Sequence, residues 1–529
     1  MKYFCNPINV PYPYQFKRDP RDNYRLSVNR EAADPSLVLF KGRYYLFASM
    51  SGAVWVSNDL AQWESVPLPE NMPIYDYAPD VRVIGDWLYF TASNRGAPCN
   101  FYRTKDPIHG PYEEIKGSFD YWDPNLFLDD DGRVYFYWGC ANATPIWGVE
   151  LDPETMRPLS DKVPLIWGNP MEHGYERFGE DNSEDPRTED EIDKLFQEFL
   201  NGCGKTAEQI PNRDMIRATF AGMPYIEGAW MTKHEGRYYL QYACPGSELN
   251  VYANGVYVSE HPLGPFRPAE NNPYSYKPGG FMPGAGHGST MRDKSGSWWH
   301  TATMRISINH VFECRVGLWP AGFDESGNLF CNQRYGDWPV NVDRLRKDPW
   351  CDPEWFLQSY KKPVSSSPYA PGKGPENAVD ESGWEVLEDK REAVTDLSHD
   401  LVITEAGVSA RYVRLTIDAV PYGVYGMAPC VSGLRVFGKG NGSRPKQAEA
   451  SIVRSGPLDF VVSTGDDPDA AGYNVLWGNS PEELYHSWMV MGTRIDRKRI
   501  GALVKGRDYY VRVDVFNENG ITEGKVEKL

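Results

Sequence analysis

The sequence lacks long apolar runs and an excess of positive charge. No run approaches the ~18–20 consecutive apolar residues that a membrane-spanning helix needs, and residues 1–7 contain no apolar core of a signal peptide. Lys and Arg number 55 against 73 Asp and Glu, which gives a formal net charge of −18. Nucleic acids, anionic membranes and polyuronic acids attract proteins of the opposite charge. We therefore expect neither nucleic acid nor a membrane as a partner.

Cysteine pairs and common catalytic motifs are also missing. The nine cysteines are odd in number and scattered, and none belongs to a CxxC pair. This pattern favours reduced thiols and a cytoplasmic protein, with an exported protein whose signal peptide has been removed as the alternative. No HExxH, GxSxG or GxGxxG motif stands where it could form a site, which excludes the simplest zinc peptidases, α/β-hydrolases and dinucleotide-binding proteins.

Helical periodicity is rare, whereas aromatic residues are abundant. Only residues 189–199 place apolar side chains at helical spacing among charged ones. The rest of the chain contains short runs rich in Val, Tyr, Phe and Trp, separated by Gly, Pro, Asn and Asp turns, as in β-strands. The 17 Trp, 33 Tyr and 22 Phe are enough for both a large core and a cleft that stacks on a ligand. These features predict an all-β protein.

A glycine turn that leads into an aromatic strand occurs five times. The five segments are residues 41–47, 85–90, 131–137, 235–241 and 295–300. They recur at roughly 45-residue intervals, which is typical of four-stranded propeller blades, apart from one longer gap that contains the helical stretch. The repeat predicts a five-bladed β-propeller over residues 1–341, with a helical insertion at about 170–220.

A polar residue precedes each of these hairpins, near the start of the strand that would be innermost. The five residues are Asp34, Asp80, Asp123, Glu227 and His287. Because the innermost strands of a propeller line its central channel, we expect these side chains to converge on one axis. Asp80 lies closer to its glycine than the others, and we interpret it as a structural hydrogen-bond acceptor.

Paired carboxyl groups at such an axis suit the cleavage of glycosidic bonds, in which one protonates the leaving oxygen and the other activates water or attacks the sugar. The apolar and aromatic neighbours of Glu227 should raise its pKa and keep it protonated, as a general acid requires. Asp34 lies in an apolar setting before Pro35, where a turn-capping role is the alternative to a catalytic one. Arg305 could contact a sugar, or equally be a surface residue.

The sequence resembles glycoside hydrolase family 43, whose members are five-bladed propellers that include β-xylosidases and α-L-arabinofuranosidases. The resemblance covers about residues 20–340 and rests on segments 33–36, 77–80, 122–132, 226–230 and 286–289. It implies that Asp34 is the general base, Glu227 the general acid and Asp123 a third carboxylate that orients the acid. It also implies inversion of configuration, for which the acid and base must lie roughly 6.5–9.5 Å apart. His287 matches the axial histidine of the family, often associated with a calcium ion or water.

The resemblance further implies an exo-acting hydrolase that removes terminal α-L-arabinofuranosyl or β-D-xylosyl residues from plant-derived oligosaccharides. The resemblance implies that the chemistry needs no cofactor. It allows a calcium ion near His287. The alternatives are the same mechanism acting on galactofuranosides or galactosides, and a sugar-binding propeller without catalysis. Four aromatic residues near the motifs are candidates for a sugar pocket, with core packing as the equal alternative for each: Trp55, Tyr77, Trp122 and Trp230.

The sequence changes in character after about residue 341. Residues 363–372 have the composition of a linker, and residues 362–440 resemble a discoidin-type carbohydrate-binding module that has lost several strands. The last stretch has several short strands, which is consistent with a small β-sandwich, and it resembles a fibronectin type III domain. We therefore expect a linker and shortened discoidin-like β-sandwich over 342–444 and a fibronectin type III-like domain over 445–529.

Overall fold

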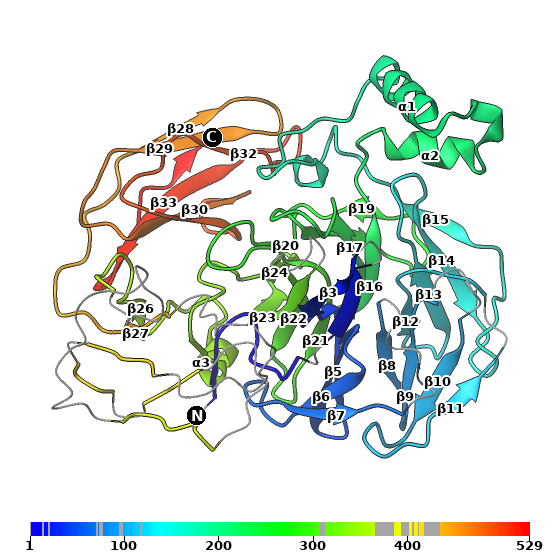
Figure 1. Cartoon of the computed structure of the whole chain (residues 1–529), viewed down its shortest axis with the longest axis horizontal. Helices are drawn as coiled ribbons and strands as arrows, with labels where there is room; N and C mark the ends of the chain where they lie inside the picture. Colours follow the sequence, from blue (N-terminus) through cyan, green and yellow to red (C-terminus); the bar gives the residue numbers. More distant parts are fainter. Residues whose placement is uncertain are drawn as a thin grey trace.

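The structure, a computed structural model, is an all-β protein built around five antiparallel sheets (Figure 1). It describes residues 2–12, 15–19, 22–69, 72, 78–94, 99–116, 119–306, 313–364, 386–392, 401–404, 407–410, 412–416 and 434–529. Each of the five sheets contains one of the predicted glycine-turn hairpins, with the glycine at positive φ. The prediction of a five-bladed β-propeller followed by β-sandwich structure is confirmed.

The five blades follow one another along the chain. Blade 1 contains β4 (Ala33–Phe40), β5 (Arg43–Ser49), β6 (Ala53–Ser57) and β7 (Glu64–Pro67). Blade 2 contains β8 (Asp80–Ile84), β9 (Trp87–Thr91), β10 (Phe101–Thr104) and β11 (Glu113–Ile115). Blade 3 contains β12 (Asn125–Leu128), β13 (Val134–Trp138), β14 (Ile146–Leu151) and β15 (Val163–Ile166).

Blades 4 and 5 complete the set. Blade 4 contains β16 (Glu227–His234), β17 (Arg237–Cys244), β18 (Ala253–Ser259) and β19 (Arg267–Pro268), and β20 (Ser275–Tyr276) also pairs with β18. Blade 5 contains β21 (Gly286–Arg292), β22 (Trp298–Arg305), β23 (Cys314–Phe323) and β24 (Leu329–Cys331).

The blades close into a ring. The innermost strands contact one another in the cyclic order β4, β8, β12, β16, β21 and back to β4. The amino-terminal segment secures this closure, because the Asn6 side chain donates to the backbone oxygen of Leu318 at 2.8 Å and the Ile8 N–H donates to that of Val316 at 2.9 Å. In addition, β1 (Tyr3–Phe4) pairs with β25 (Val340–Asn341), just before α3 (Val342–Lys347). A separate hairpin of β2 (Gln15–Asp19) and β3 (Asp22–Asn29) precedes blade 1.

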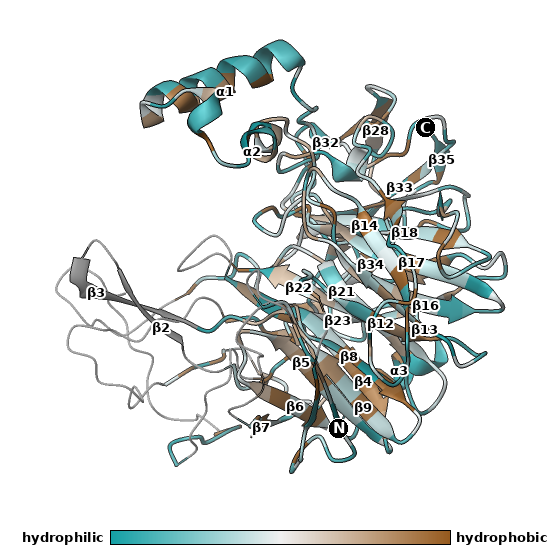
Figure 2. Cartoon of the chain, turned by 90° about the vertical axis from the view of Figure 1, so that its right-hand side faces the viewer, coloured by the Kyte–Doolittle hydropathy of each residue, from teal (hydrophilic) through white to brown (hydrophobic). Residues whose placement is uncertain are grey.

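The insertion between blades 3 and 4 contains helices α1 (Glu189–Cys203) and α2 (Arg213–Thr219). Thr188 and Glu191 form a capping box at the start of α1, and Gly204 ends it in the left-handed conformation. Phe196 and Leu200 of α1 bury their side chains in a small apolar cluster with Ile216 of α2. The helical pair therefore has its own core, and it stands out from the body of the protein in Figure 2.

The carboxyl-terminal region is a β-sandwich. One sheet has the order β28 (Ala450–Arg454), β29 (Phe460–Thr464), β32 (Lys498–Ile500). The other has the order β31 (His486–Met491), β30 (Gly472–Gly478), β33 (Tyr510–Asn517), β34 (Gly520–Thr522), and β35 (Glu527–Lys528) also pairs with β33. Tyr276 of blade 4 packs against Trp477 and Trp488, with ring centroids 5.8 and 6.2 Å apart. The sandwich thus shares one core with the propeller.

Between the propeller and the sandwich, the described residues form one short pair of strands, β26 (Phe356–Leu357) with β27 (Phe437–Gly438). Most of the discoidin-like segments, including 374–380 and Trp384, lie outside the described residues, so that resemblance stays a prediction. The eight described cysteines are all free thiols. Within the described part of the chain, no helix combines the length and apolar character needed to cross a membrane.

Candidate active site

Irregular backbone turns the axial residues toward the centre of the ring. Asp34, Asp123 and His287 have φ values of 52°, 51° and 40°, and Gly228, next to Glu227, has 59°. The strand pairing shifts register at Asp34, Glu227 and His287, as it does at a β-bulge. Such bulges redirect a side chain and are common beside active sites. The innermost strands therefore carry these side chains to one place, as the repeat in the sequence predicts.

His287 holds two of the carboxylates. Its Nδ1 lies 3.2 Å from Oδ1 of Asp34 and 3.6 Å from Oδ2 of Asp123. Burial alone would lower the pKa of His287, but the carboxylates of Asp34, Asp123 and Glu227 together raise it above its usual value. The raised pKa favours the charged imidazolium form of His287, whose Nδ1 bridges blades 1 and 3.

Hydroxyl groups fix the position of Asp34. Ser49 Oγ donates to Oδ2 of Asp34 at 2.6 Å, and the Asp34 N–H donates to Oγ1 of Thr303 at 2.9 Å. With the imidazolium on Oδ1, both carboxylate oxygens have a partner. The carboxylate is thereby held in one orientation, as a group that must deprotonate a water molecule requires.

Glu227 is held by two residues for which the sequence gives no evident signal. The Tyr252 hydroxyl donates to Oε1, and the Cys140 thiol donates to Oε2 at 3.2 Å. Burial is the main cause that raises the pKa of Glu227, and the negative charge of Asp34 adds to it. The pKa of Asp123 is raised in the same way, first by burial and then by Glu227 and Asp34. The site thus combines a proton-holding carboxyl with an oriented carboxylate, which is the pair that acid–base cleavage needs.

Within the described part of the chain, Asp80 acts as a structural hydrogen-bond acceptor, which agrees with our interpretation of the sequence. Its Oδ1 accepts from the Asn125 side chain at 2.9 Å and its Oδ2 from the Leu126 N–H at 2.6 Å. Arg82 lies 3.9 Å from Oδ1 and stacks on the indole of Trp230 at 3.5 Å. Asp80 therefore ties blade 2 to blade 3.

The aromatic candidates divide between core and surface. Trp55 is fully buried and donates to the backbone oxygen of Pro11, and Trp230 is 4% exposed and covered by Arg82. Both indoles pack the protein interior, which favours core packing over a pocket role for Trp55 and Trp230. Trp122 is partly exposed, and Tyr77 lies outside the described residues.

Two pairs of polar side chains involve the insertion between blades 3 and 4. Arg305 lies 3.3 Å from Oε1 of Glu180, which brings the insertion to the edge of blade 5. His173 and Glu176 of the insertion are both buried. His173 Nδ1 lies 3.0 Å from Oε1 of Glu176, under the carboxyl-terminal sandwich that Gly174 contacts through its N–H.

The described residues do not fit a calcium site by themselves. Calcium takes six to eight oxygen ligands, and the groups at His287 Nδ1 are two carboxylates that already pair with the imidazolium. Asp123, Cys140 and Glu227 also bring donor atoms within 4.8 Å of one another, but a thiol is not a calcium ligand. A calcium ion near His287 stays a prediction, and no step of the chemistry depends on it.

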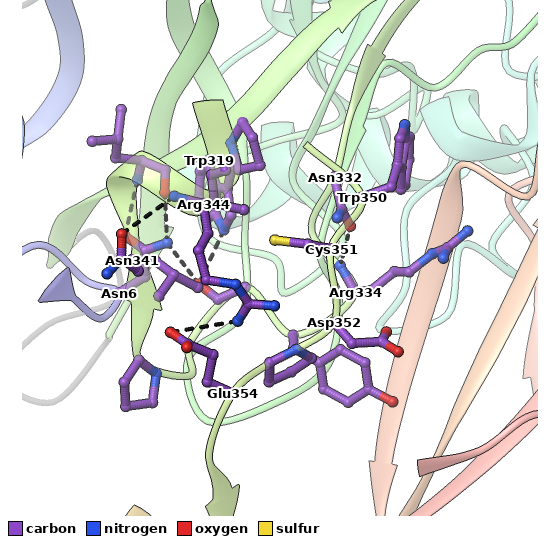
Figure 3. Close-up of a pocket in the computed structure, with 18 residues that line it drawn as sticks. Asn6, Trp319, Asn332, Arg334, Asn341, Arg344, Trp350, Cys351, Asp352 and Glu354 are labelled. Carbon is purple, nitrogen blue, oxygen red and sulfur yellow. Dashed lines mark hydrogen bonds and ion pairs between the residues drawn. The ribbon is translucent and has the colours of Figure 1, made fainter. Parts of the chain in front are cut away.

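A separate hollow beside blade 5 differs from the axial site in its lining and size (Figure 3). Among the residues that line it are Trp319, Arg334, Arg344, Trp350 and Glu354. Its cavity volume of about 40 Å³ has room for one or two water molecules and not for a sugar ring. None of the axial carboxyl groups lines this hollow. The candidate active site is therefore the cluster at the ring axis.

The ring of blades and its axial carboxyl cluster define the protein as an enzyme of the glycoside hydrolase class. The family model "Glycosyl hydrolases family 43" matches residues 27–176 and 184–310, which is more than half of the chain. The protein therefore belongs to glycoside hydrolase family 43, in agreement with the resemblance found in the sequence.

Individual relatives are distant. The chain is 25% identical over 354 residues to a xylosidase/arabinosidase 43A of Humicola insolens, an alignment that covers 58% of this chain and 97% of that one. It is 28% identical over 170 residues to a β-xylosidase of Xylanibacter ruminicola, of which it covers 44%, with 30% of this chain aligned. A solved thermostable family-43 glycoside hydrolase is 20% identical, with a TM-score of 0.42, and the match covers 62% of this chain and 95% of that one.

Proposed function

We propose that the protein is an exo-acting, inverting glycosidase that removes terminal α-L-arabinofuranosyl or β-D-xylosyl residues from plant-derived oligosaccharides. The observation that carries the proposal is the pairing of one protonated and one oriented carboxyl group around the axis. Burial raises the pKa of Glu227, whereas Ser49 and His287 hold the Asp34 carboxylate in place. The names of the relatives, a xylosidase/arabinosidase and a β-xylosidase, support a pentose as the sugar.

In the proposed reaction Glu227 gives its proton to the leaving glycosidic oxygen while Asp34 takes a proton from the attacking water. The water adds to the anomeric carbon from the face opposite the leaving group, so the configuration inverts in a single step. Asp123 does not exchange a proton with the substrate; its Oδ2 accepts from the Gly228 N–H at 3.3 Å and thereby orients the segment that carries Glu227. Arg305 and Trp122 are the remaining candidates for sugar contacts.

A panel of aryl glycosides tests the proposal, with NMR assignment of the first anomer released. We expect turnover of α-L-arabinofuranosides or β-D-xylosides and an inverted first product. The panel includes aryl galactosides and galactofuranosides. If these are hydrolysed preferentially, the substrate is a galactoside or galactofuranoside rather than a pentoside. Binding of sugars in a calorimeter without any turnover would instead show a non-catalytic sugar-binding propeller.

The two carboxyl groups can be tested directly. Asp34→Asn and Glu227→Gln should each lower kcat by about 10²–10⁴-fold, because each removes an acid or base from the reaction. Asp80→Asn is a matched control, since Asp80 is also an axial carboxyl but contacts only structural groups in the described residues. Wild-type turnover in both Asp34→Asn and Glu227→Gln would contradict the mechanism.

A further inference from the structure

The second strand of several blades ends in a small polar side chain that reaches the next blade. Ser49 at the end of β5 accepts from the Ala78 N–H at 2.7 Å, and Ser93 just after β9 accepts from the Asp123 N–H at 3.0 Å. Thr303 near the end of β22 does the same for the Asp34 N–H. Each hydroxyl therefore positions the axial segment of the following blade.

Cys140 occupies the corresponding place between blades 3 and 4. It follows β13, and its neighbour Ala141 forms a backbone bridge with Ile226, the residue before Glu227. Its thiol reaches Oε2 of Glu227 itself, and the residue is partly buried. A thiol thus stands at Glu227 where three other blade junctions have a hydroxyl.

The two oxygens of Glu227 consequently have unequal partners. The Tyr252 hydroxyl is a strong donor to Oε1, whereas a thiol is a weak donor and a weak acceptor at Oε2. A carboxyl group that accepts a strong hydrogen bond on one oxygen holds its proton on the other. These unequal partners favour Oε2, beside the sulfur, as the oxygen that carries a proton of Glu227.

We propose that Cys140 is a positioning residue for the proton donor: its thiol keeps the transferable proton on Oε2 of Glu227 and, because it stabilises the carboxylate less than a hydroxyl would, keeps Glu227 protonated to higher pH. This inference rests on the proposed function in assigning Glu227 as the acid. It goes beyond that function because it names the group that sets the upper pH limit of activity and the oxygen of Glu227 from which the proton is transferred. Cys140 keeps its own proton throughout the reaction, because the thiol only forms a hydrogen bond with Glu227.

Other titratable groups act on Glu227 and must be kept unchanged in the test. They face it from every blade packed around it: Asp34, Asp123, His287, Tyr225, Cys244 and Tyr252. A substitution of Cys140 by Ser leaves all of them in place and changes only the sulfur to oxygen.

The experiment compares the pH profiles of kcat/KM for wild type, Cys140→Ser and Cys140→Ala. Cys140→Ser should move the upper limb of the profile to lower pH by about one unit, since a hydroxyl donor stabilises the ionised carboxylate. Cys140→Ala should move it to higher pH and should slow glycosides with poor leaving groups far more than dinitrophenyl glycosides, which need no acid. Cys331→Ser, a buried thiol on β24 in the same propeller, is the control and should leave the profile unchanged.

An infrared titration of the free enzyme gives a readout that needs no substrate. The carbonyl band of protonated Glu227, identified by its loss in Glu227→Gln, should disappear at lower pH in Cys140→Ser than in wild type. An identical midpoint in both proteins overturns the inference, even if the glycoside panel shows hydrolysis. A shifted midpoint without hydrolysis of any glycoside would support the role of the thiol while rejecting the proposed function.

Discussion

Gly228 lies against the imidazole of His287 so closely that a Cβ on Gly228 would be 2.6 Å from Cγ of the ring. Gly228 also has a φ of 59°. The residue after Glu227 must therefore be glycine for two reasons, the left-handed backbone and the contact with the imidazolium.

Gly228→Ala should displace His287 and lower kcat by about 10²-fold, because a shift of even 1 Å at the reacting groups is costly. The matched control is Gly42→Ala in the first hairpin turn, where φ is 79° but no atom lies within 4 Å of the added Cβ. The control should lose stability from strain, by about 1 kcal/mol, and keep its kcat. Equal effects of the two substitutions on kcat would contradict the steric argument.

Ser49→Ala should lower kcat by about tenfold, because it removes the hydroxyl that donates to Oδ2 of Asp34. Steady-state kinetics on the best aryl glycoside measures the effect. Ser51→Ala is the control, since the Ser51 hydroxyl is equally buried but donates only to backbone oxygens of Ala48 and Ala53. A similar loss of kcat in Ser51→Ala would indicate a general packing effect instead.

The raised pKa of His287 makes stability depend on pH. In the folded state the imidazole stays charged above its usual pKa of about 6.5, so folding takes up a proton in that range. The stabilisation is complete below about pH 6.5 and is lost as the pH rises through the raised value. Urea unfolding of the wild type across this range should show a falling free energy of unfolding.

His287→Gln should remove this part of the pH dependence and destabilise the protein by about 1–3 kcal/mol, because Asp34 and Asp123 lose the partly buried imidazole that contacts both. His109→Gln is the control, since its imidazole pairs with Asp106 on the surface. An unfolding free energy of His287→Gln that falls as steeply between about pH 6.5 and 8 as that of the wild type would contradict the assignment of the imidazolium.

The pair between Arg177 and Asp459 joins the insertion to the carboxyl-terminal sandwich. Arg177 is 3% exposed in its side chain, lies 2.6 Å from Oδ1 of Asp459 and also donates to the backbone oxygen of Gly501. Arg177→Ala should lower the free energy of unfolding by about 1–3 kcal/mol, since the buried Asp459 carboxylate loses one of its two arginine partners and keeps Arg499. Arg494→Ala, which breaks an exposed pair with Asp496, should change stability by less than about 0.5 kcal/mol in the same denaturant titration.

Much of the fold can be predicted from the sequence because each blade is encoded locally. The glycine turns and aromatic strands recur, and the axial residues other than Asp80 stand eight or nine residues before the turn glycine, as for Asp34 and Glu227. Burial across blades is not encoded locally, so the sequence alone could not decide between a pocket and core packing for Trp55 and Trp230. Cys140 and Tyr252 escape prediction for the same reason, since they reach Glu227 only after strand ends from blades 3 and 4 meet.

The packing of Tyr276 against Trp477 and Trp488 limits how this enzyme can be engineered. A shorter variant that stops before residue 445 would leave an aromatic surface of blade 4 open to solvent, and such surfaces promote aggregation. Grafting a foreign sugar-binding module in place of the sandwich meets the same difficulty, because the replacement would have to supply matching rings. Designers who want a different accessory module should therefore add it while keeping the sandwich, rather than exchange the sandwich for it.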